Sequence, residues 1–203
     1  MRRYFDDGAR ERQLRIQRVA EAAARKSTDP TRHRCFVSYH IDDDAEVTQF
    51  VDTFGYVFIP TVVGVTEDDD FVESDDTDYI LRRIREEYLS STTVTIVLVG
   101  RCTWARRFVD WEVYASLRRY TDYAPSALLA INLPSVANDS GRQLPARVND
   151  NVRNTDEGYA RWWTYPSSGE QLRTCIDIAF DARTYHTDLI DNRRARKVNS
   201  SPG

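Results

Sequence analysis

Residues 93–120 decide the fold, and they read TVTIVLVG followed by RCTWARRFVDWEVYASLRRY. The run from Thr93 to Gly100 is short, apolar and rich in β-branched residues, which is typical of a strand buried on both faces of a parallel sheet. From Thr103 onward the sequence has a helical period, with one apolar stripe made by Trp104, Phe108, Trp111 and Ala115. The stretch therefore predicts a buried strand followed by an amphipathic helix.

Glu112 lies at the edge of that apolar stripe. A carboxylate at such a position is partly removed from water, so its pKa is expected to rise. An alternative is an ordinary helix-edge residue that reaches water or pairs with Arg107 or Arg119. Position alone does not separate the two.

The rest of the chain repeats this alternation of strands and helices. Further strands are expected at residues 35–40, 56–59, 127–133 and 161–165. Helix-capping signals are expected at Asp43 or Asp44, at Thr77 and at the capping box Ser167–Glu170, while Gly55 supplies a helix stop. The pattern predicts an α/β fold with a flavodoxin-like, doubly wound, mostly parallel five-stranded sheet. Ligands of such sheets bind beyond the carboxyl ends of the strands, where Ser38–Asp43 and Gly100–Glu112 should meet.

Three regions are expected along the chain. Residues 1–33 form a basic N-terminal extension, with nine Arg or Lys against five Asp or Glu, which is either a docking helix or a solvated arm. Residues 34–182 form the folded body, including a polar loop at 134–156. Residues 183–203 form a polar tail that should fray. The body is expected to fold without residues 1–33.

An acidic loop at residues 61–77 is the least regular part of the body. A solvated, mobile loop is the first interpretation, and a lid over a site is an alternative. A hard-cation site is a third, although the spacing does not fit an EF-hand. The three histidines also lack metal-ligand spacing, and no metal is expected.

Composition excludes several classes of protein. The 203 residues carry a formal charge of −4, of which the extension contributes +4 and the remainder −8, so no nucleic-acid-binding surface is expected. Three cysteines without a C-x-x-C motif fit a reduced cytoplasm. No apolar run reaches 18 residues, so no membrane span is expected.

Familiar motifs of nucleotide-binding α/β folds are absent. There is neither a G-x-x-x-x-G-K-[ST] loop nor a G-x-G-x-x-G after the first strand. A phospho-acceptor receiver domain needs an Asp at the end of the central strand and a Lys after the last one, but that strand ends at Gly100 and the two lysines are Lys26 and Lys197. The turn after the first strand is also too acidic for a flavin phosphate loop.

Two segments resemble TIR domains. FVSYHIDD at residues 36–43 is similar to the TIR first-strand motif, and FVDWE at residues 108–112 is similar to the motif in which an aromatic residue precedes the catalytic Glu by four. Val109 stands where the usual motif has Cys. With STTVTIVLVG at residues 91–100 and RRFVDWE at 106–112, residues 34–180 resemble most closely the TIR-like proteins of the Thoeris anti-phage systems.

The resemblance implies an enzyme that cleaves NAD+ between nicotinamide and ribose, with Glu112 as the catalytic residue. It further implies a product derived from ADP-ribose, often a cyclic isomer, that activates a partner effector protein after a phage-derived trigger. NAD+ is then a substrate rather than a cofactor, and homo-oligomerisation on activation is expected in the cytoplasm. The alternatives are a TIR-like scaffold without catalysis and a nucleotide receptor without turnover.

Several side chains are candidates to bind the substrate. The aromatic candidates for stacking are Phe36, Tyr39, Phe108 and Trp111, each of which could instead be core. The candidates for ribose or phosphate are Ser38, His40 and Asp43, where Asp43 could instead cap a helix. Arg101 or Arg106 is a candidate for the pyrophosphate, with a surface role as the alternative.

Overall fold

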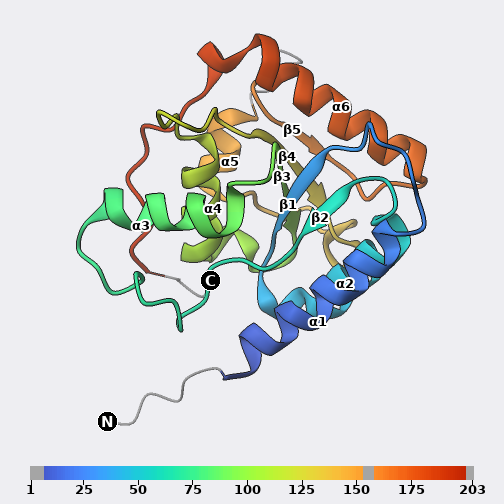
Figure 1. Ribbon diagram of the computed structural model, residues 1–203, viewed down its shortest axis with the longest axis horizontal. Helices are drawn as coiled ribbons and strands as arrows, with labels where there is room; N and C mark the ends of the chain where they lie inside the picture. The colour runs from blue at the N-terminus through green and yellow to red at the C-terminus, as the bar shows by residue number, and fades with distance from the viewer. Residues whose placement is uncertain (1–6, 153–157, 200–203) are drawn as a thin grey trace.

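The computed structural model describes residues 7–152 and 158–199. Its centre is a five-stranded, all-parallel sheet with the strand order β2-β1-β3-β4-β5 (Figure 1). The strands are β1 (Arg34–Ser38), β2 (Ile59–Thr61), β3 (Val94–Val99), β4 (Ala127–Asn132) and β5 (Arg161–Trp163). This is the flavodoxin-like arrangement that the sequence predicts.

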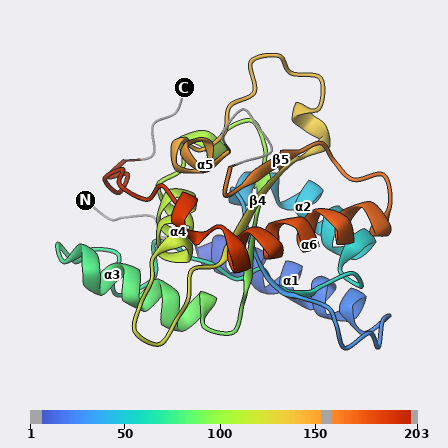
Figure 2. The ribbon, with the colours of Figure 1, turned by 90° about the horizontal axis from the view of Figure 1, so that it is seen from above.

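Helices cover both faces of the sheet (Figure 2). One face carries α1 (Asp7–Ala24), α2 (Asp44–Phe54) and α6 (Gly169–Tyr185). The other carries α3 (Thr77–Ile84), which continues as the π-helical turn η2 (Arg85–Leu89), together with α4 (Arg107–Leu117) and α5 (Ala146–Asn151). The sheet is therefore doubly wound. The helices that follow the neighbouring strands β1 and β3 lie on opposite faces, and ligands of such sheets bind beyond the carboxyl ends of these two strands.

The burial of the two central strands explains their apolar sequences. Every residue of β3 and of β4 is buried, because helices cover both faces. Alternate side chains enter opposite layers: Ile96 packs toward α1, α2 and α6, whereas Val97 packs toward α4 and α5. In the register Ile96 lies between Val37 and Leu129. Because successive side chains of a strand point to opposite faces, one apolar run contributes side chains to both layers of the core.

Some local predictions were wrong by a few residues. The second strand is Ile59–Thr61 rather than 56–59, and it contains Pro60, which an edge strand tolerates because one of its sides needs no ladder bonds. Asp76, not Thr77, caps α3, since its carboxylate accepts from the N–H groups of residues 78 and 79. The cap of α6 is Ser168, whose hydroxyl accepts from the Gln171 N–H.

Two further segments differ from expectation. The predicted helix from Thr103 starts with a 3-10 turn, η3 (Thr103–Ala105), and extended Arg106 separates that turn from α4. The predicted loop 134–156 contains the 3-10 turn η4 (Pro134–Val136) and helix α5, while its residues 153–156 lie outside the described part.

Helix α1 is packed, so the solvated-arm alternative is wrong for residues 7–24. Ile16, Ala20 and Ala23 are fully buried, and α1 lies beside α2 and β2 (Figure 1). The close approach depends on Gly55, where a Cβ atom would lie 2.8 Å from the Ala23 Cβ. The glycine that ends α2 is therefore needed for helix contact, and its φ of −59° is one that any residue adopts.

The predicted fraying of the tail is also wrong for residues 183–199. Helix α6 continues to Tyr185, and the C-terminal segment (residues 187–199) begins with the 3-10 turn η5 (Thr187–Leu189) and runs back past α5 and α4 (Figure 1). Asn151 fixes it through two hydrogen bonds of 2.8 and 2.9 Å with the backbone of Asp191. Within the described residues, no helix has the length and apolarity that a membrane span requires.

Candidate active site

A cavity of about 280 Å³ lies at the carboxyl ends of β1 and β3. Three segments that follow strands surround it: Tyr39–Ile41 after β1, Gly64–Asp68 after β2, and the turn between β3 and α4 with the first part of α4. The fourth wall is α1, through Ala9 and Gln13. The cavity thus occupies the place where ligands of doubly wound sheets bind.

Glu112 projects from α4 into this cavity and is only 4% exposed. The Ser38 hydroxyl donates to Oε2 at 2.6 Å, and the Val65 N–H donates to Oε1 at 2.9 Å. Burial raises the pKa of this carboxyl from 4.5 to about 7, although both hydrogen bonds oppose that rise. The alternative of a helix-edge Glu that reaches water is therefore wrong.

Gly64 allows the backbone to approach that carboxylate. A Cβ atom at this position would collide with the Glu112 Oε1 and would lie 3.2 Å from the Phe36 ring. The backbone φ of Gly64 is not positive, so the glycine is required by space and not by conformation. Close approach brings the N–H of the next residue, Val65, within hydrogen-bonding distance of Glu112.

Aromatic and polar side chains share the walls of the cavity. Tyr39 and Phe108 supply aromatic surface, and burial raises the pKa of Tyr39, which keeps its hydroxyl protonated. Burial and the nearby Arg106 lower the pKa of His40, so its imidazole is neutral at pH 7. The Tyr39 hydroxyl and the Arg106 Nε are buried without a hydrogen-bond partner among the described residues. Both side chains therefore carry a buried polar atom whose hydrogen-bonding capacity is unused among the described residues.

Comparison with known families identifies the chain. The sequence model of the family described as Thoeris protein ThsB, TIR-like domain, matches residues 36–138, which is just over half of the 203 residues. The chain belongs to this family. No curated protein matches the sequence significantly.

The protein is accordingly a TIR-like protein of Thoeris anti-phage defence. The matched residues contain Ser38, Gly64, Val65 and Glu112, which make the carboxylate site described above. They do not contain α1, α5, α6 or the C-terminal segment. One wall of the TIR-like cavity, α1, and the C-terminal segment that contacts α4 are therefore built by parts of the chain beyond the family match.

Not every predicted binding residue lines the TIR-like cavity. Tyr39, His40, Phe108 and Arg106 do, and Ser38 holds Glu112. Phe36 is fully buried in the core below Gly64, and Arg101 is exposed and does not line the cavity.

Asp43 also lies outside the cavity. It occupies the N-cap position of α2 but makes no capping bond with its side chain. Its carboxylate accepts from the Thr103 hydroxyl at 3.4 Å and lies against Gly100, where a Cβ atom would collide with it. Burial raises the pKa of Asp43 to about 6. Through these contacts Asp43 connects the start of α2 to the turn that follows β3.

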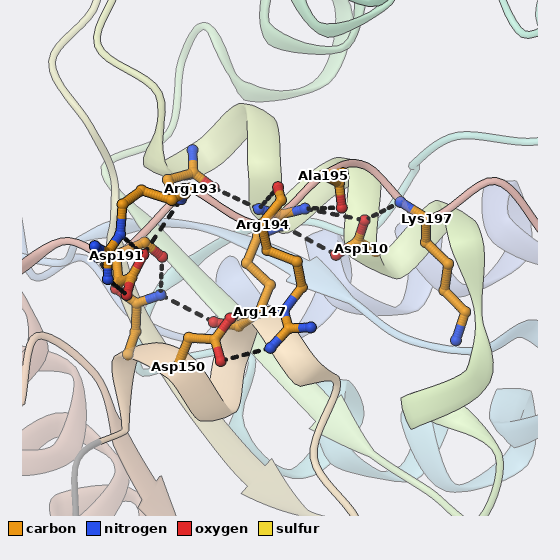
Figure 3. Close-up of polar contacts among 10 residues, drawn as sticks. Asp110, Arg147, Asp150, Asp191, Arg193, Arg194, Ala195 and Lys197 are labelled. Atoms are coloured by element: carbon orange, nitrogen blue, oxygen red, sulfur yellow. Dashed lines mark hydrogen bonds and ion pairs between the residues drawn. The ribbon is translucent and has the colours of Figure 1, made fainter.

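Trp111 faces the C-terminal segment instead of the cavity. Its indole N–H donates to the Lys197 carbonyl at 2.7 Å, and the Arg196 guanidinium lies 4.1 Å from the ring centroid. Next to it, Asp110 pairs with Arg147 of α5 at 3.0 Å and accepts from the Lys197 N–H at 2.7 Å (Figure 3). Helix α4 thus presents Glu112 to the cavity and its two preceding residues to the C-terminal segment.

Arg147 is the centre of that second contact. Its side chain is fully buried, and it donates to Asn192 Oδ1 and the Arg194 carbonyl at 2.9 Å and to the Ala195 carbonyl at 3.1 Å (Figure 3). Arg147 lies in a segment that the sequence predicts as loop. Neither the hydrophobic period nor the spacing of a motif predicts that this Arg is buried.

The acidic loop is fastened rather than freely mobile. Phe71 is fully buried, and Asp69 accepts from the Thr66 N–H at 2.6 Å and from the Tyr88 hydroxyl. Glu67 pairs with Arg107 at the mouth of the cavity. Among the described residues, no group of three or more His, Cys, Asp or Glu is placed to hold a metal ion. The loop forms a wall of the site.

Proposed function

We propose that this TIR-like domain cleaves NAD+ at the bond between nicotinamide and ribose, with Glu112 as the catalytic residue. The observation that carries the proposal is a buried carboxylate, held by Ser38 and Val65, at a cavity beyond the carboxyl ends of the strands. Burial costs a carboxylate its hydration, so a Glu with a purely structural role is expected at the surface.

The chemistry of NAD+ suits a single carboxylate. When the bond from ribose C1′ to the pyridinium nitrogen breaks, its electron pair leaves with nicotinamide, which departs neutral and needs no general acid. Positive charge then develops on the ribose, and an ionised Glu112 stabilises it in a site from which water is largely excluded. A nucleophile, either water or another group of the same substrate, forms the new bond to C1′ and loses its proton.

The other walls offer contacts for the rest of NAD+. In this proposal Tyr39 and Phe108, which line the cavity, pack on the nicotinamide ring, and the carboxylate of Asp68 favours its positive charge. In this proposal the guanidinium of Arg106, a residue that lines the cavity, meets the pyrophosphate. Pockets for drug-sized ligands span about 300–1,000 Å³. The cavity of about 280 Å³ lies just below this range, so we expect it to hold part of NAD+ and not the whole molecule.

The proposal extends to the role in defence. The product is an ADP-ribose derivative, a cyclic isomer in the first instance, that activates a partner effector protein in the cytoplasm. A phage-derived trigger and homo-oligomerisation on activation complete this scheme.

Incubation of the purified full-length protein with NAD+, alone and with lysate of phage-infected cells, tests the proposal by mass spectrometry. We expect NAD+ to disappear while nicotinamide and an ADP-ribose-derived species appear. Glu112→Gln should abolish turnover, and Glu170→Gln, an exposed residue of α6, should not. Intact NAD+ in every condition with folded protein would instead favour a scaffold without catalysis.

A further inference from the structure

Helix α1 binds the backbone of the segment that follows β2. The Val62 N–H donates to Gln17 Oε1 at 2.8 Å, and Gln17 Nε2 donates to the Pro60 carbonyl at 3.4 Å. The Gly64 N–H donates to Gln13 Oε1 at 3.3 Å. Side chains of the helix therefore bond to alternate residues of the segment, as a neighbouring strand would.

Arg10 completes this series at the residue closest to the site. Its Nη1 donates to the Gly64 carbonyl at 3.3 Å and to the Tyr88 hydroxyl at 3.3 Å. Arg10, Gln13 and Gln17 are spaced by three and four residues, which places them on one side of the helix. Gly64 is thus bound by α1 through both its N–H and its carbonyl group.

The bound peptide group is the one that contacts Glu112. The Gly64 carbonyl and the Val65 N–H belong to a single planar peptide unit, so fixing the oxygen also fixes the direction of the N–H. That N–H donates to Glu112 Oε1 at 2.9 Å. A guanidinium on the oxygen polarises the unit, and linked hydrogen bonds of this kind strengthen one another.

We infer that α1 is part of the active site and that Arg10 and Gln13 are positioning residues, which hold Gly64 so that the Gly64–Val65 peptide meets Glu112. Arg10 binds the carbonyl of that peptide, and Gln13 binds the N–H of the peptide before it. The inference rests on the proposed NAD+ cleavage. It assigns a role to a helix that lies outside the segment matched by the family. Gln13 is only 8% exposed and, with Ala9, also lines the cavity, so the helix contributes both a wall and a support.

Three variants of one helix test this role. Arg10→Met and Gln13→Met remove hydrogen bonds to Gly64 while keeping side-chain length, and Gln17→Met removes the bonds to residues 60 and 62 as a matched control. Ile16, Ala20 and Ala23 stay in place, so the fold is retained. We expect kcat/KM for NAD+ to fall about tenfold in Arg10→Met, as for loss of a charge-assisted bond, by a smaller factor in Gln13→Met, whose bond is uncharged, and little in Gln17→Met. Arg10→Lys should recover part of the loss, because it restores a donor.

The pH profile separates positioning from a general loss of structure. A weaker Val65 N–H bond favours the protonated Glu112, so the midpoint of activity against pH should move upward in Arg10→Met and Gln13→Met and stay in place in Gln17→Met. The other titratable groups that face Glu112 or its cavity are unchanged in all three variants: Tyr39, His40, Glu67, Asp68, Asp69 and Arg106. Equal losses in all three variants without a shift in midpoint would overturn the inference, and so would no loss at all.

A second readout does not depend on turnover. Carbon-13 NMR of the glutamate carboxyl groups, with the Glu112 signal assigned by its absence in Glu112→Gln, follows its titration directly. An upward shift in Arg10→Met and Gln13→Met but not in Gln17→Met supports the positioning role even if NAD+ stays intact. Identical Glu112 titration in all the proteins would refute it, whether or not NAD+ is cleaved.

Discussion

Helix α1 contacts the loop that holds Glu112, whereas the C-terminal segment contacts the helix that carries it. The first contact combines buried alkyl groups with side-chain hydrogen bonds to backbone, of which the three glutamine bonds are uncharged. The second is centred on a buried ion pair, Asp110 with Arg147. Hydrophobic burial is additive and tolerant of small changes, but a buried charge depends on every one of its partners. The two ends of the chain should therefore fail in different ways when altered.

The largest effect is expected on the C-terminal side. Arg147→Met leaves the carboxylate of Asp110, which is 6% exposed, without its cation and also frees two carbonyls of the C-terminal segment. We expect a loss of about 3–5 kcal/mol in the free energy of unfolding, measured by urea denaturation. Asp110→Asn in the same chain should recover part of that loss, because the buried charge disappears. A loss below about 1 kcal/mol would show that the pair is not the centre of this contact.

The next effect concerns Glu112 itself, where both contacts meet. Between pH 4.5 and about 7 the folded protein keeps a proton on Glu112 that the unfolded chain releases, so stability falls as pH rises through this window. Glu112→Gln removes this dependence and should be more stable than the parent at pH 8 by about 3 kcal/mol, with the difference vanishing near pH 4.5. Thermal unfolding at pH 4.5, 6 and 8 checks the sign, and equal stabilities at pH 8 would mean that Glu112 has an ordinary pKa.

Activity should follow the opposite trend. Catalysis needs the ionised carboxylate, so kcat/KM for NAD+ should rise through about pH 7, the value to which burial raises the Glu112 pKa. Arg147→Met should leave that midpoint unchanged, whereas Arg10→Met and Gln13→Met in α1 should shift it. A shift in Arg147→Met would erase the difference between the two contacts.

A smaller effect is expected where α1 meets α2. Gly55→Ala adds a Cβ atom 2.8 Å from the Ala23 Cβ and against the Val51 carbonyl, so the helices must separate. Overpacking of this kind costs about 1–3 kcal/mol, measurable by urea denaturation. Ala22→Ser, on the exposed side of α1, is the control and should change stability by less than about 0.5 kcal/mol. Unchanged stability in Gly55→Ala would show that α1 adjusts its position freely.

The smallest effect is expected at an exposed ion pair of the C-terminal segment. Arg194 pairs with Asp150 at 2.7 Å, but half of its side chain is in water. Arg194→Met should therefore change stability by no more than about 1 kcal/mol. Comparison with Arg147→Met isolates burial as the variable, because both arginines bind an aspartate near the same segment.

Much of the architecture can be predicted from the sequence because it rests on short-range patterns. The apolar runs of β3 and β4, the period of α4 and the place of Glu112 on its edge all give the observed fold and the carboxylate of the site. These features need only local periodicity and the rule that ligands bind beyond the strand ends.

The supports of the site could not be predicted in the same way. Gln13 and Arg147 are polar residues that point inward, and their partners are 51 and 37 positions away in the chain. Hydrophobic patterning assigns such residues to the surface, because it does not register a buried polar group whose hydrogen bonds are satisfied. For the same reason the C-terminal segment, which is mostly polar, has the composition of a frayed tail.

The hydrogen bonds from α1 to the segment around Gly64 limit which of its residues can change among relatives. The bonds that Gln17, Gln13 and Arg10 make to this segment all go to its peptide groups. The side chains of Val62, Val63 and Val65 can therefore change without loss of these bonds. Gly64 cannot, since any side chain there collides with Glu112. Val62 and Val65 are buried, so in relatives that retain the helix we expect exchanges among apolar residues on either side of an unchanged glycine.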